Sequence, residues 1–500
     1  MFSLSTKTTL TAQEQEKGLK WVLRDGVASQ AMLTLTGGAF LVAYALKLGA
    51  SNAQIGFLAA IPTLSNIFQL LSIRLVERYT NRRKTIVYSL LVGRFAFFIM
   101  AVIPFLNVGY PVVLLITAAA LLQSLAAISA GCWSSWMRDL IPSDQTGTFF
   151  SKRMRVSQAV GVGLSLLIAL ALDYIKAFYP EQEVASYALL FLLGGLVGYA
   201  GIFFLAQTPE PQASIAHIRF KDMLKLPFQH RPFRNLIWYN GLWNFSTNLA
   251  APFFTVYLLQ RLNYSVSIVI VLTVISQITT IVSLRLWGKY ADQYSFKVIL
   301  GICAPLYLFG VLGWTFTTLP QKHLFTFPLL ILLHLLMGFA SGGTGLAASG
   351  IGLKLAPKEQ SVVYLSVISM TNAVTAGVAP IIGGLLADFF VSQELSLVLS
   401  WKGTTRNTVI QALNLQALDF FFVFAFFFGL LALYRLGFIQ EEGDVEEKVL
   451  LQEIRYELQK EMKNLSTITG ARAMIKLPAT LFQSLSSRYA EHKTRREKSS

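Results

Sequence analysis

Charged residues are scarce in this chain of 500 residues, at 14% of all positions. Hydrophobic residues make up 54%, and the mean hydropathy is +0.55. So few charges cannot cover the surface of a water-soluble protein of this length. The composition therefore predicts an integral membrane protein.

Cysteine is also rare, with two residues, and histidine has five. Cys132 and Cys303 lie far apart in apolar stretches and belong to no CxxC or His-rich cluster, which argues against a disulfide framework or a metal site. The chain lacks the GxxxxGK[ST] motif of nucleotide-binding loops, so ATP is not expected to drive it. It also lacks a nucleophile and base at motif spacing. We therefore expect no enzyme activity, no cofactor and no metal.

The hydrophobic residues gather in blocks of about 20, the length of helix that crosses about 30 Å of hydrocarbon. About twelve such blocks can be distinguished, and each predicts a membrane-spanning helix. They lie near 22–46, 53–73, 85–106, 111–136, 156–178, 186–206, 235–259, 265–287, 298–319, 327–350, 361–390 and 411–436.

Lysine and arginine are concentrated in the loops that follow the even-numbered blocks, whereas the loops after odd-numbered blocks hold few. Basic loops mark the cytoplasmic side of a membrane protein. We therefore expect both termini to be cytoplasmic, in a multi-pass protein of a bacterial inner membrane. The net charge of +16 then reflects topology and contact with lipid, and no nucleic-acid partner is expected.

The chain contains a weak internal repeat. An offset of 215 residues leads from Glu77 to Asp292 and from Tyr79 to Tyr294, and it aligns 137–175 with 352–390 without a gap. Two similar halves related by an axis along the membrane normal are typical of secondary transporters, whose substrate site lies between the halves.

This repeat predicts an all-α protein made of two pseudo-symmetric six-helix bundles. The expected segments are a cytoplasmic N-terminal segment (1–20), an N-terminal bundle (21–206), a cytoplasmic linker (207–234), a C-terminal bundle (235–437) and a cytoplasmic, helical and basic tail (438–500).

Two loop segments, ERYTNRRK and GKYADQYSFK, resemble the two copies of the motif Gly-x-x-x-Asp-Arg-x-Gly-Arg-Arg of the major facilitator superfamily. The resemblance covers residues 20–437 and implies twelve transmembrane helices and secondary transport. Ile73 replaces the motif glycine of the first copy, and Gln293 stands where the second copy should have a base. The positions that the resemblance assigns to the motif are Glu77, Arg78, Arg82 and Arg83 in the first copy and Gly288, Asp292 and Lys297 in the second.

An acid at the cytoplasmic end of a helix can pair with bases and with the positive N-terminus of a neighbouring helix. Pairing of this kind between the halves predicts a gate at the motif. In the alternative interpretation the bases only hold the loop on the cytoplasmic side. That alternative explains the bases but not the acid present in both copies.

Three ionisable residues at membrane depth are candidates for coupling, because such residues are costly in lipid and usually functional. Asp25 can carry a proton, or it can form a salt bridge with Arg24 or a basic loop. Arg94 can hold an anionic substrate or take part in a structural pair. His334 can relay a proton or be hydrogen-bonded within the packed helices.

Two further acids, Asp173 and Asp388, close the fifth and eleventh predicted helices. We expect them at an interface, with an outer gate as the alternative.

The seventh predicted helix carries the stretch YNGLWNFSTNLAAP, in which Asn240, Asn244 and Asn248 recur every four residues beside Trp243. Residues at this spacing share one face of a helix. Such a face suits a polar, hydroxylated ligand, or it can form hydrogen bonds between helices. Further candidates for the substrate cavity are Gln30, Thr34, Gln123, Gln158, Gln277 and Asn372.

Together these features predict a transporter that moves a small solute by alternating access, driven by a proton or another ion or acting as a facilitator. The asparagine face favours a polar solute such as a sugar, whereas the 37 phenylalanines favour export of an amphipathic compound. A transporter-like receptor or scaffold that acts through its cytoplasmic tail is the alternative from another class.

Overall fold

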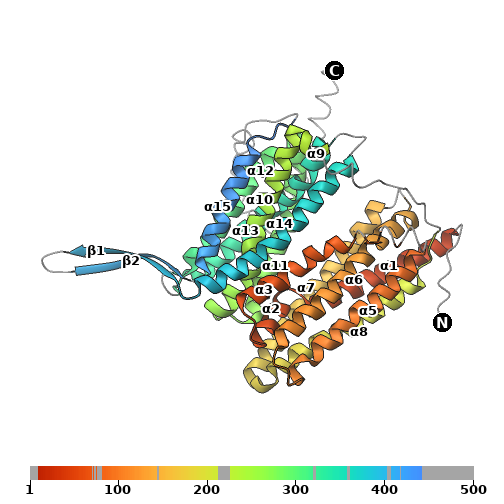
Figure 1. The fold of residues 1–500 in the computed structure, drawn as a ribbon, viewed down its shortest axis with the longest axis horizontal. Helices are drawn as coiled ribbons and strands as arrows, with labels where there is room; N and C mark the ends of the chain where they lie inside the picture. Colours follow the sequence, from red (N-terminus) through yellow and green to blue (C-terminus); the bar gives the residue numbers. More distant parts are fainter. Residues whose placement is uncertain are drawn as a thin grey trace, which may run out of the picture. The chain divides into compact units, whose positions relative to one another are not determined.

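A computed structural model describes residues 10–441, apart from 70, 73–74, 76–80, 143–145, 212–225, 319–321, 357–360, 403–406 and 417. The tail from residue 442 onward and most of the predicted linker lie outside the described residues. The described part is almost entirely helical, and its helices form two halves (Figure 1).

The N-terminal half follows the predicted order of helices. Its elements are α1 (Ala12–Thr36), α2 (Gly38–Lys47), α3 (Asn52–Ser65), η1 (Asn66–Phe68), α5 (Arg82–Val102), η2 (Ile103–Phe105), α6 (Pro111–Leu140), α7 (Thr146–Phe178), η3 (Pro180–Gln182) and α8 (Glu183–Gln207).

The C-terminal half repeats this order. Its elements are α9 (Leu226–Gln229), α10 (Arg231–Val256), the π-helical turn η4 (Tyr257–Arg261), α11 (Val266–Gln293), α12 (Phe296–Gly313), η5 (Trp314–Thr317), α13 (Thr326–Leu355), α14 (Ser361–Phe390), β1 (Glu394–Lys402), β2 (Asn407–Gln416) and α15 (Asp419–Leu436).

The first spanning segment is interrupted between α1 and α2. Gly38 has φ +55°, a left-handed conformation that glycine adopts without the steric penalty of a side chain. The equivalent segment of the second half contains Pro252 and then changes from α10 into the π-turn η4. Both halves therefore depart from a regular α-helix in their first spanning segment.

Hydroxyl side chains fix the starts of several helices. The Thr11 Oγ1 accepts a hydrogen bond from the Glu14 N–H at 3.3 Å, and the Glu14 carboxylate accepts one from the Thr11 N–H at 3.1 Å. Ser51 and Gln54 form the same capping box at α3. These reciprocal bonds satisfy N–H groups that have no partner within the helix.

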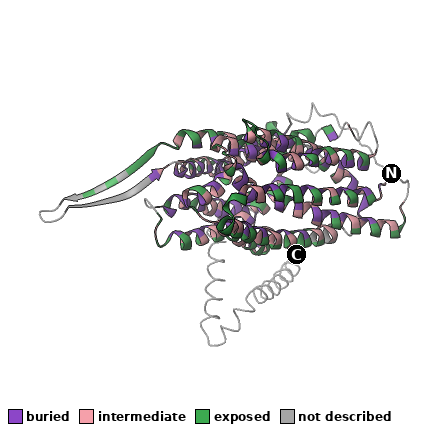
Figure 2. Ribbon diagram, turned by 90° about the horizontal axis from the view of Figure 1, so that it is seen from below, coloured by how far each residue is buried: buried purple, intermediate pink, exposed green. Residues whose placement is uncertain are grey.

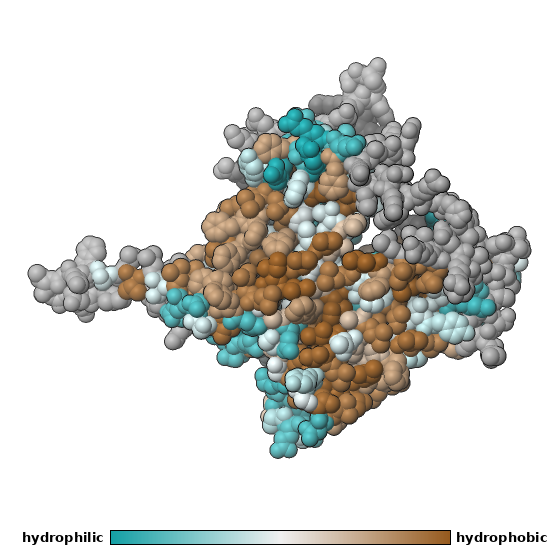
Figure 3. Space-filling view, in the orientation of Figure 1, coloured by the Kyte–Doolittle hydropathy of each residue, from teal (hydrophilic) through white to brown (hydrophobic). Residues whose placement is uncertain are grey.

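Ten helical segments among the described residues are long and apolar enough to cross a membrane. At the two remaining positions, α3 has 14 residues before the chain passes into η1, and α10 is a continuous helix of 26 residues whose sequence includes three asparagines. Apolar side chains cover the middle of the helices, and hydrophilic ones gather toward their ends (Figure 3). The predicted helical architecture of two similar halves is confirmed, and with α3 and α10 the order of helices is consistent with the predicted twelve.

The twelfth spanning helix begins later than predicted. Residues 411–416 belong to strand β2, which pairs antiparallel with β1 from Glu394↔Gln416 to Lys402↔Asn407. The prediction of a helix from residue 411 is therefore wrong for these residues. Only the last four residues of NTVIQALNLQ, Leu413 to Gln416, alternate between apolar and polar, so the period of two that is typical of a strand is weak here. The hairpin extends away from the helices (Figure 1).

Each half has its own apolar core. Tyr44, Phe97 and Phe191 are buried in the N-terminal half, and Phe253 and Phe421 in the C-terminal half. Buried and exposed residues alternate along the helices (Figure 2), as expected for helices that pack on one face and meet lipid on the other. Each core also includes side chains of the other half, Val266 and Ile270 in the first core and Ile55 in the second, so the two bundles also pack against each other.

The two halves meet mainly through α3 against α14 and through α7 against α11. The first contact is close: a Cβ added to Gly56 would lie 2.2 Å from the Pro380 carbonyl oxygen, and one added to Gly384 would lie 2.5 Å from that of Asn52. We call the end of the halves that carries β1 and β2 the hairpin end. The opposite end, which carries Arg82, Arg138, Lys289 and Lys354, is the basic end.

Candidate transport cavity and charged sites

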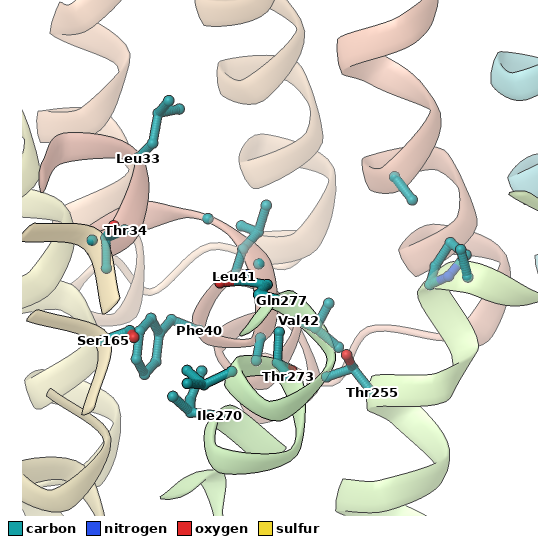
Figure 4. Close-up of a pocket in the computed structure, with 18 of the residues that line it drawn as sticks. Leu33, Thr34, Phe40, Leu41, Val42, Ser165, Thr255, Ile270, Thr273 and Gln277 are labelled. Atoms are coloured by element: carbon teal, nitrogen blue, oxygen red, sulfur yellow. The ribbon is translucent and has the colours of Figure 1, made fainter. Parts of the chain in front are cut away.

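A cavity of about 540 Å³ lies between the two halves, and Figure 4 shows part of its lining. It is lined by α1, α2, α3 and α7 on one side and by α10 and α11 on the other. No charged residue is found in this lining, as far as the structure describes it. Its polar members are Gln30, Thr34, Gln158, Ser165, Thr255, Thr273 and Gln277.

The break after α1 and a glycine of α7 shape this shared cavity. Gly37 and Gly38 belong to its lining, so the backbone itself forms part of the wall. A Cβ added to Gly161 would lie 2.8 Å from the Gln30 Nε2 and 3.3 Å from the Thr34 Oγ1. Glycine at this position therefore lets α7 pack closely against the polar side chains of α1.

A second cavity, of about 510 Å³, lies within the C-terminal half, between α10, α13 and α14. The described residues of its lining are also uncharged. Its polar members are Asn240, Trp243, Asn244, Ser341, Thr344, Ser349, Ser369 and Asn372. We call it the asparagine cavity.

The asparagines of α10 form a ladder along the helix. The Nδ2 atoms of Asn240, Asn244 and Asn248 donate to the carbonyl oxygens four residues earlier, at 3.0, 2.9 and 2.8 Å. Asn244 Nδ2 also donates to Asn372 Oδ1 on α14, at 3.0 Å. Two bonds use both protons of this amide, so the Asn244 Oδ1 is left as an acceptor and the Asn372 Nδ2 as a donor.

Trp243 forms an aromatic wall of the same cavity. Its ring stacks on Tyr239, with the ring centroids 6.3 Å apart, and meets the ring of Tyr307 edge-on at 5.7 Å. Rings held in this way offer a rigid apolar surface beside the amide groups.

Eight of the ten predicted cavity residues line one of the two cavities, and Gln123 and Asn248 line neither. His334 also lies away from both: its Nδ1 is 2.7 Å from the Leu330 carbonyl oxygen, and its ring packs on Trp314. Sequence reasoning missed Ser341, Thr344, Ser349 and Ser369, because single hydroxyls in apolar helices give no pattern.

A buried charged cluster lies within the N-terminal half. Asp25 on α1 is 3% exposed, and its Oδ1 accepts a hydrogen bond from Ser29 Oγ at 3.2 Å. Arg153 on α7 lies on the other side, with Nη2 4.0 Å from Asp25 Oδ2. Arg94 on α5 donates to the Gly198 carbonyl and reaches Ser29 Oγ at 3.5 Å. Four helices therefore meet around one carboxylate.

The described partner of Asp25 is thus Arg153, from the region predicted to be a basic loop. Arg24 instead lies over the ring of Trp21, 4.6 Å from its centroid. Asp25 and Asn240 are 215 residues apart, the offset of the repeat. The same position of the fold therefore carries an acid in one half and its neutral amide in the other.

At the basic end, Arg82 and Arg83 are held within the N-terminal half. Arg82 Nη1 lies 2.5 Å from Asp139 Oδ2, and Glu210 accepts hydrogen bonds from the backbone N–H groups of Arg82 at 2.6 Å and Arg83 at 3.2 Å. Glu210 thus caps the N-terminus of α5. Glu77, Arg78 and the side chain of Asp292 lie outside the described residues, so a gate at the motif stays a prediction.

The second half has an equivalent cap. Glu441 accepts hydrogen bonds from the backbone N–H groups of Phe296 at 3.2 Å and Lys297 at 2.8 Å, and it pairs with Lys354 at 2.8 Å. Sequence reasoning missed Glu210 and Glu441, although both follow the last helix of their half. Gly288 has open space around it, since an added Cβ would meet nothing within 4 Å.

The family model of the Major Facilitator Superfamily matches residues 26–380 and, in a second match, residues 240–460. The chain belongs to this superfamily, as the loop motif had indicated. A search of curated proteins finds no sequence match.

Solved structures of transporters share the fold. The nucleoside transporter NupG has a TM-score of 0.61 and 12% identity, with 85% of this chain and 98% of that chain covered. A bacterial homologue of the iron transporter ferroportin, in an inward-facing state, gives 0.61 and 14%, with 86% and 98% covered. A bacterial homologue of the human lysosomal transporter Spinster gives 0.56 and 14%, with 76% and 84% covered.

At these identities the likeness shows the fold alone. Together with the family match and the spanning helices, it makes the chain a multi-pass secondary transporter that moves a small molecule through a lipid membrane.

Proposed function

We propose that this transporter carries an uncharged solute bearing hydroxyl or amide groups, through the cavity shared by its two halves and by alternating access. The observation that carries the proposal is the lining of both cavities, which is neutral throughout the described residues. A charged solute in a site of low dielectric constant needs an opposite charge or a metal beside it. Neutral amides and hydroxyls suit a neutral solute.

The asparagine cavity supports a solute with paired hydrogen-bonding groups. Asn244 and Asn372 present an acceptor and a donor next to each other, and a hydroxyl can serve both because it donates and accepts. Trp243 adds a flat apolar surface. A polyhydroxylated ring, which has polar edges and less polar faces, satisfies both features and is favoured here over an amphipathic export substrate.

We further propose that Asp25 couples transport to a proton gradient. It is a buried acid beside Arg153 and Ser29, and it lies outside both cavity linings. A proton carried there would change the balance of charge among α1, α5 and α7 without touching the solute. The neutral Asn240 at the equivalent position leaves the second half for solute binding.

For the orientation, the distribution of basic residues supports a cytoplasmic basic end, in a bacterial inner membrane. The proposed bundles span residues 21–206 and 235–437, joined by the cytoplasmic linker 207–234. Two cavities in the membrane region favour transport over the alternative role of a receptor or scaffold.

The experiment is a transport screen in proteoliposomes with sugars, anionic solutes and cationic amphiphiles. Asn244→Ala removes the hydrogen bond to Asn372. We expect it to weaken solute affinity about tenfold, which corresponds to the free energy of one or two hydrogen bonds. Asn235→Ala is the matched control, because Asn235 lies on the same helix and bonds to the Phe438 carbonyl outside both cavities. Sugar affinity in the Asn244→Ala protein equal to that of the Asn235→Ala control would contradict the proposal, and so would a preference of the unsubstituted protein for charged solutes.

A further inference from the structure

We propose that Asp173 and Asp388 form a paired latch that closes the hairpin end between the two halves. The proposal builds on alternating access as proposed above, but it does not depend on which solute is carried. Each carboxylate belongs to the last turns of a helix in one half and binds the first turn of a helix in the other half.

Asp388 on α14 makes the stronger contact. Its Oδ1 accepts a hydrogen bond from the Asn52 N–H and its Oδ2 one from the Ala53 N–H, both at 3.0 Å. These two N–H groups open helix α3 and have no acceptor inside that helix. Ser51, the N-cap of α3, already binds the Gln54 N–H. The carboxylate from the other half therefore completes the cap.

Asp173 on α7 makes the equivalent contact in the opposite sense. Its Oδ2 accepts a hydrogen bond from the Ser267 N–H at 3.2 Å, in the first turn of α11. Ser265, the N-cap of α11, binds the Ile268 N–H. As at α3, the serine satisfies one N–H group and the acid from the other half satisfies another.

The two contacts obey the repeat of the chain. Asp173 and Asp388 are separated by the offset of 215 residues, and so are Asn52 and Ser267. Each half thus contributes one carboxylate and one helix N-terminus. This reciprocity distinguishes the pair from an incidental surface contact, because the same arrangement occurs twice about the pseudo-twofold axis.

The location of the contacts fits a latch. Three hydrogen bonds between the halves are seen among the described residues, and all three end on these two carboxylates. At the basic end, the described acids Asp139, Glu210 and Glu441 bind groups of their own half. The described polar contacts therefore hold the halves together at the hairpin end.

The strength of the contacts suits a step that is repeated in every transport cycle. An acid at an exposed helix N-terminus favours the bound state by about two- to fivefold. When the halves separate, water can replace the partners at this end of the protein. The latch therefore biases the equilibrium between the two states without trapping either.

The test measures access to the shared cavity from each side. A reporter cysteine is introduced as Ala251→Cys in the lining of that cavity, while the native Cys132 and Cys303 stay buried. Its rate of labelling by a membrane-impermeant maleimide is compared in vesicles of both orientations, without solute. Asp173→Asn and Asp388→Asn should each raise labelling from the hairpin end about threefold, and the double variant about tenfold, while labelling from the basic end does not rise.

The matched control is Glu181→Gln, which removes an exposed acid in η3 at the same end. If the Asp173→Asn and Asp388→Asn proteins are labelled at the same rate as the Glu181→Gln protein, the proposal is overturned. A rise from both sides together would overturn it as well, because it would indicate general loosening of the protein. Since no solute is present, the result stands apart from the identity of the substrate.

Discussion

Among single residues, Asp25 and Asn240 show best how the two halves have diverged. Both occupy the same position of the repeat and are almost completely buried, at 3% and 1% exposed. Asp25 is surrounded by Ser29, Arg94 and Arg153, whereas Asn240 lines the asparagine cavity. An acid and an amide of the same size thus occupy equivalent positions in different surroundings.

We expect Asp25→Asn to separate coupling from movement of the solute. The variant keeps the size of the side chain but cannot bind and release a proton, so accumulation driven by a pH gradient should fall to simple equilibration. Exchange of labelled for unlabelled solute should persist. Both are measured in proteoliposomes, with and without the gradient.

Glu16→Gln serves as the control for this variant, because Glu16 lies on the same helix and pairs with Lys20 at the surface. Persistence of gradient-driven accumulation in the Asp25→Asn protein would rule out Asp25 as the coupling residue.

Among the elements, α3 and α14 pack so closely that their backbones nearly touch. Gly56 faces the Pro380 carbonyl, and Gly377 lies against Leu64. Close contact of this kind needs glycine, since any side chain would hold the helices apart.

We expect Gly56→Ala to impair closure of the hairpin end. The added Cβ would lie 2.2 Å from a backbone oxygen, so α3 has to move away from α14 at a cost of about 1–3 kcal/mol. Transport should slow several-fold, and the thermal stability in detergent should fall.

Gly163→Ala on α7 is the matched variant, since a Cβ there would meet nothing within 4 Å. If the two variants have equal transport rates and melting temperatures, the close approach of α3 to α14 is needed neither for transport nor for stability.

The elements also show where sequence reasoning succeeds and where it stops. Apolar blocks and the four-residue spacing of the asparagines are local patterns, so the helix order and Asn244 on a cavity wall could be predicted. The strand β2 was missed because its apolar residues merge with those of α15. Arg153 beside Asp25, and Glu210 beside Arg82, depend on helices far apart in sequence, and no local pattern reports such contacts.

At the scale of the whole molecule, the chain divides into two units after residue 441. Residues 1–441 and 442–500 form separate units, and both cavities lie in the first. We therefore expect a protein that ends after Glu441 to transport at nearly the full rate. Flux per protein in proteoliposomes measures this, with the full chain as reference. Loss of flux in a protein that is still folded would show that the tail takes part in transport.

The ribbon formed by β1 and β2 extends away from the helices of this transporter (Figure 1). We therefore expect that antibodies can bind to it. Leu395 and Val398 are exposed on this ribbon, so part of its surface is apolar. No described residue of the ribbon belongs to either cavity lining, so we expect a binding protein raised against it to attach outside both cavities and to mark one end of the protein for imaging.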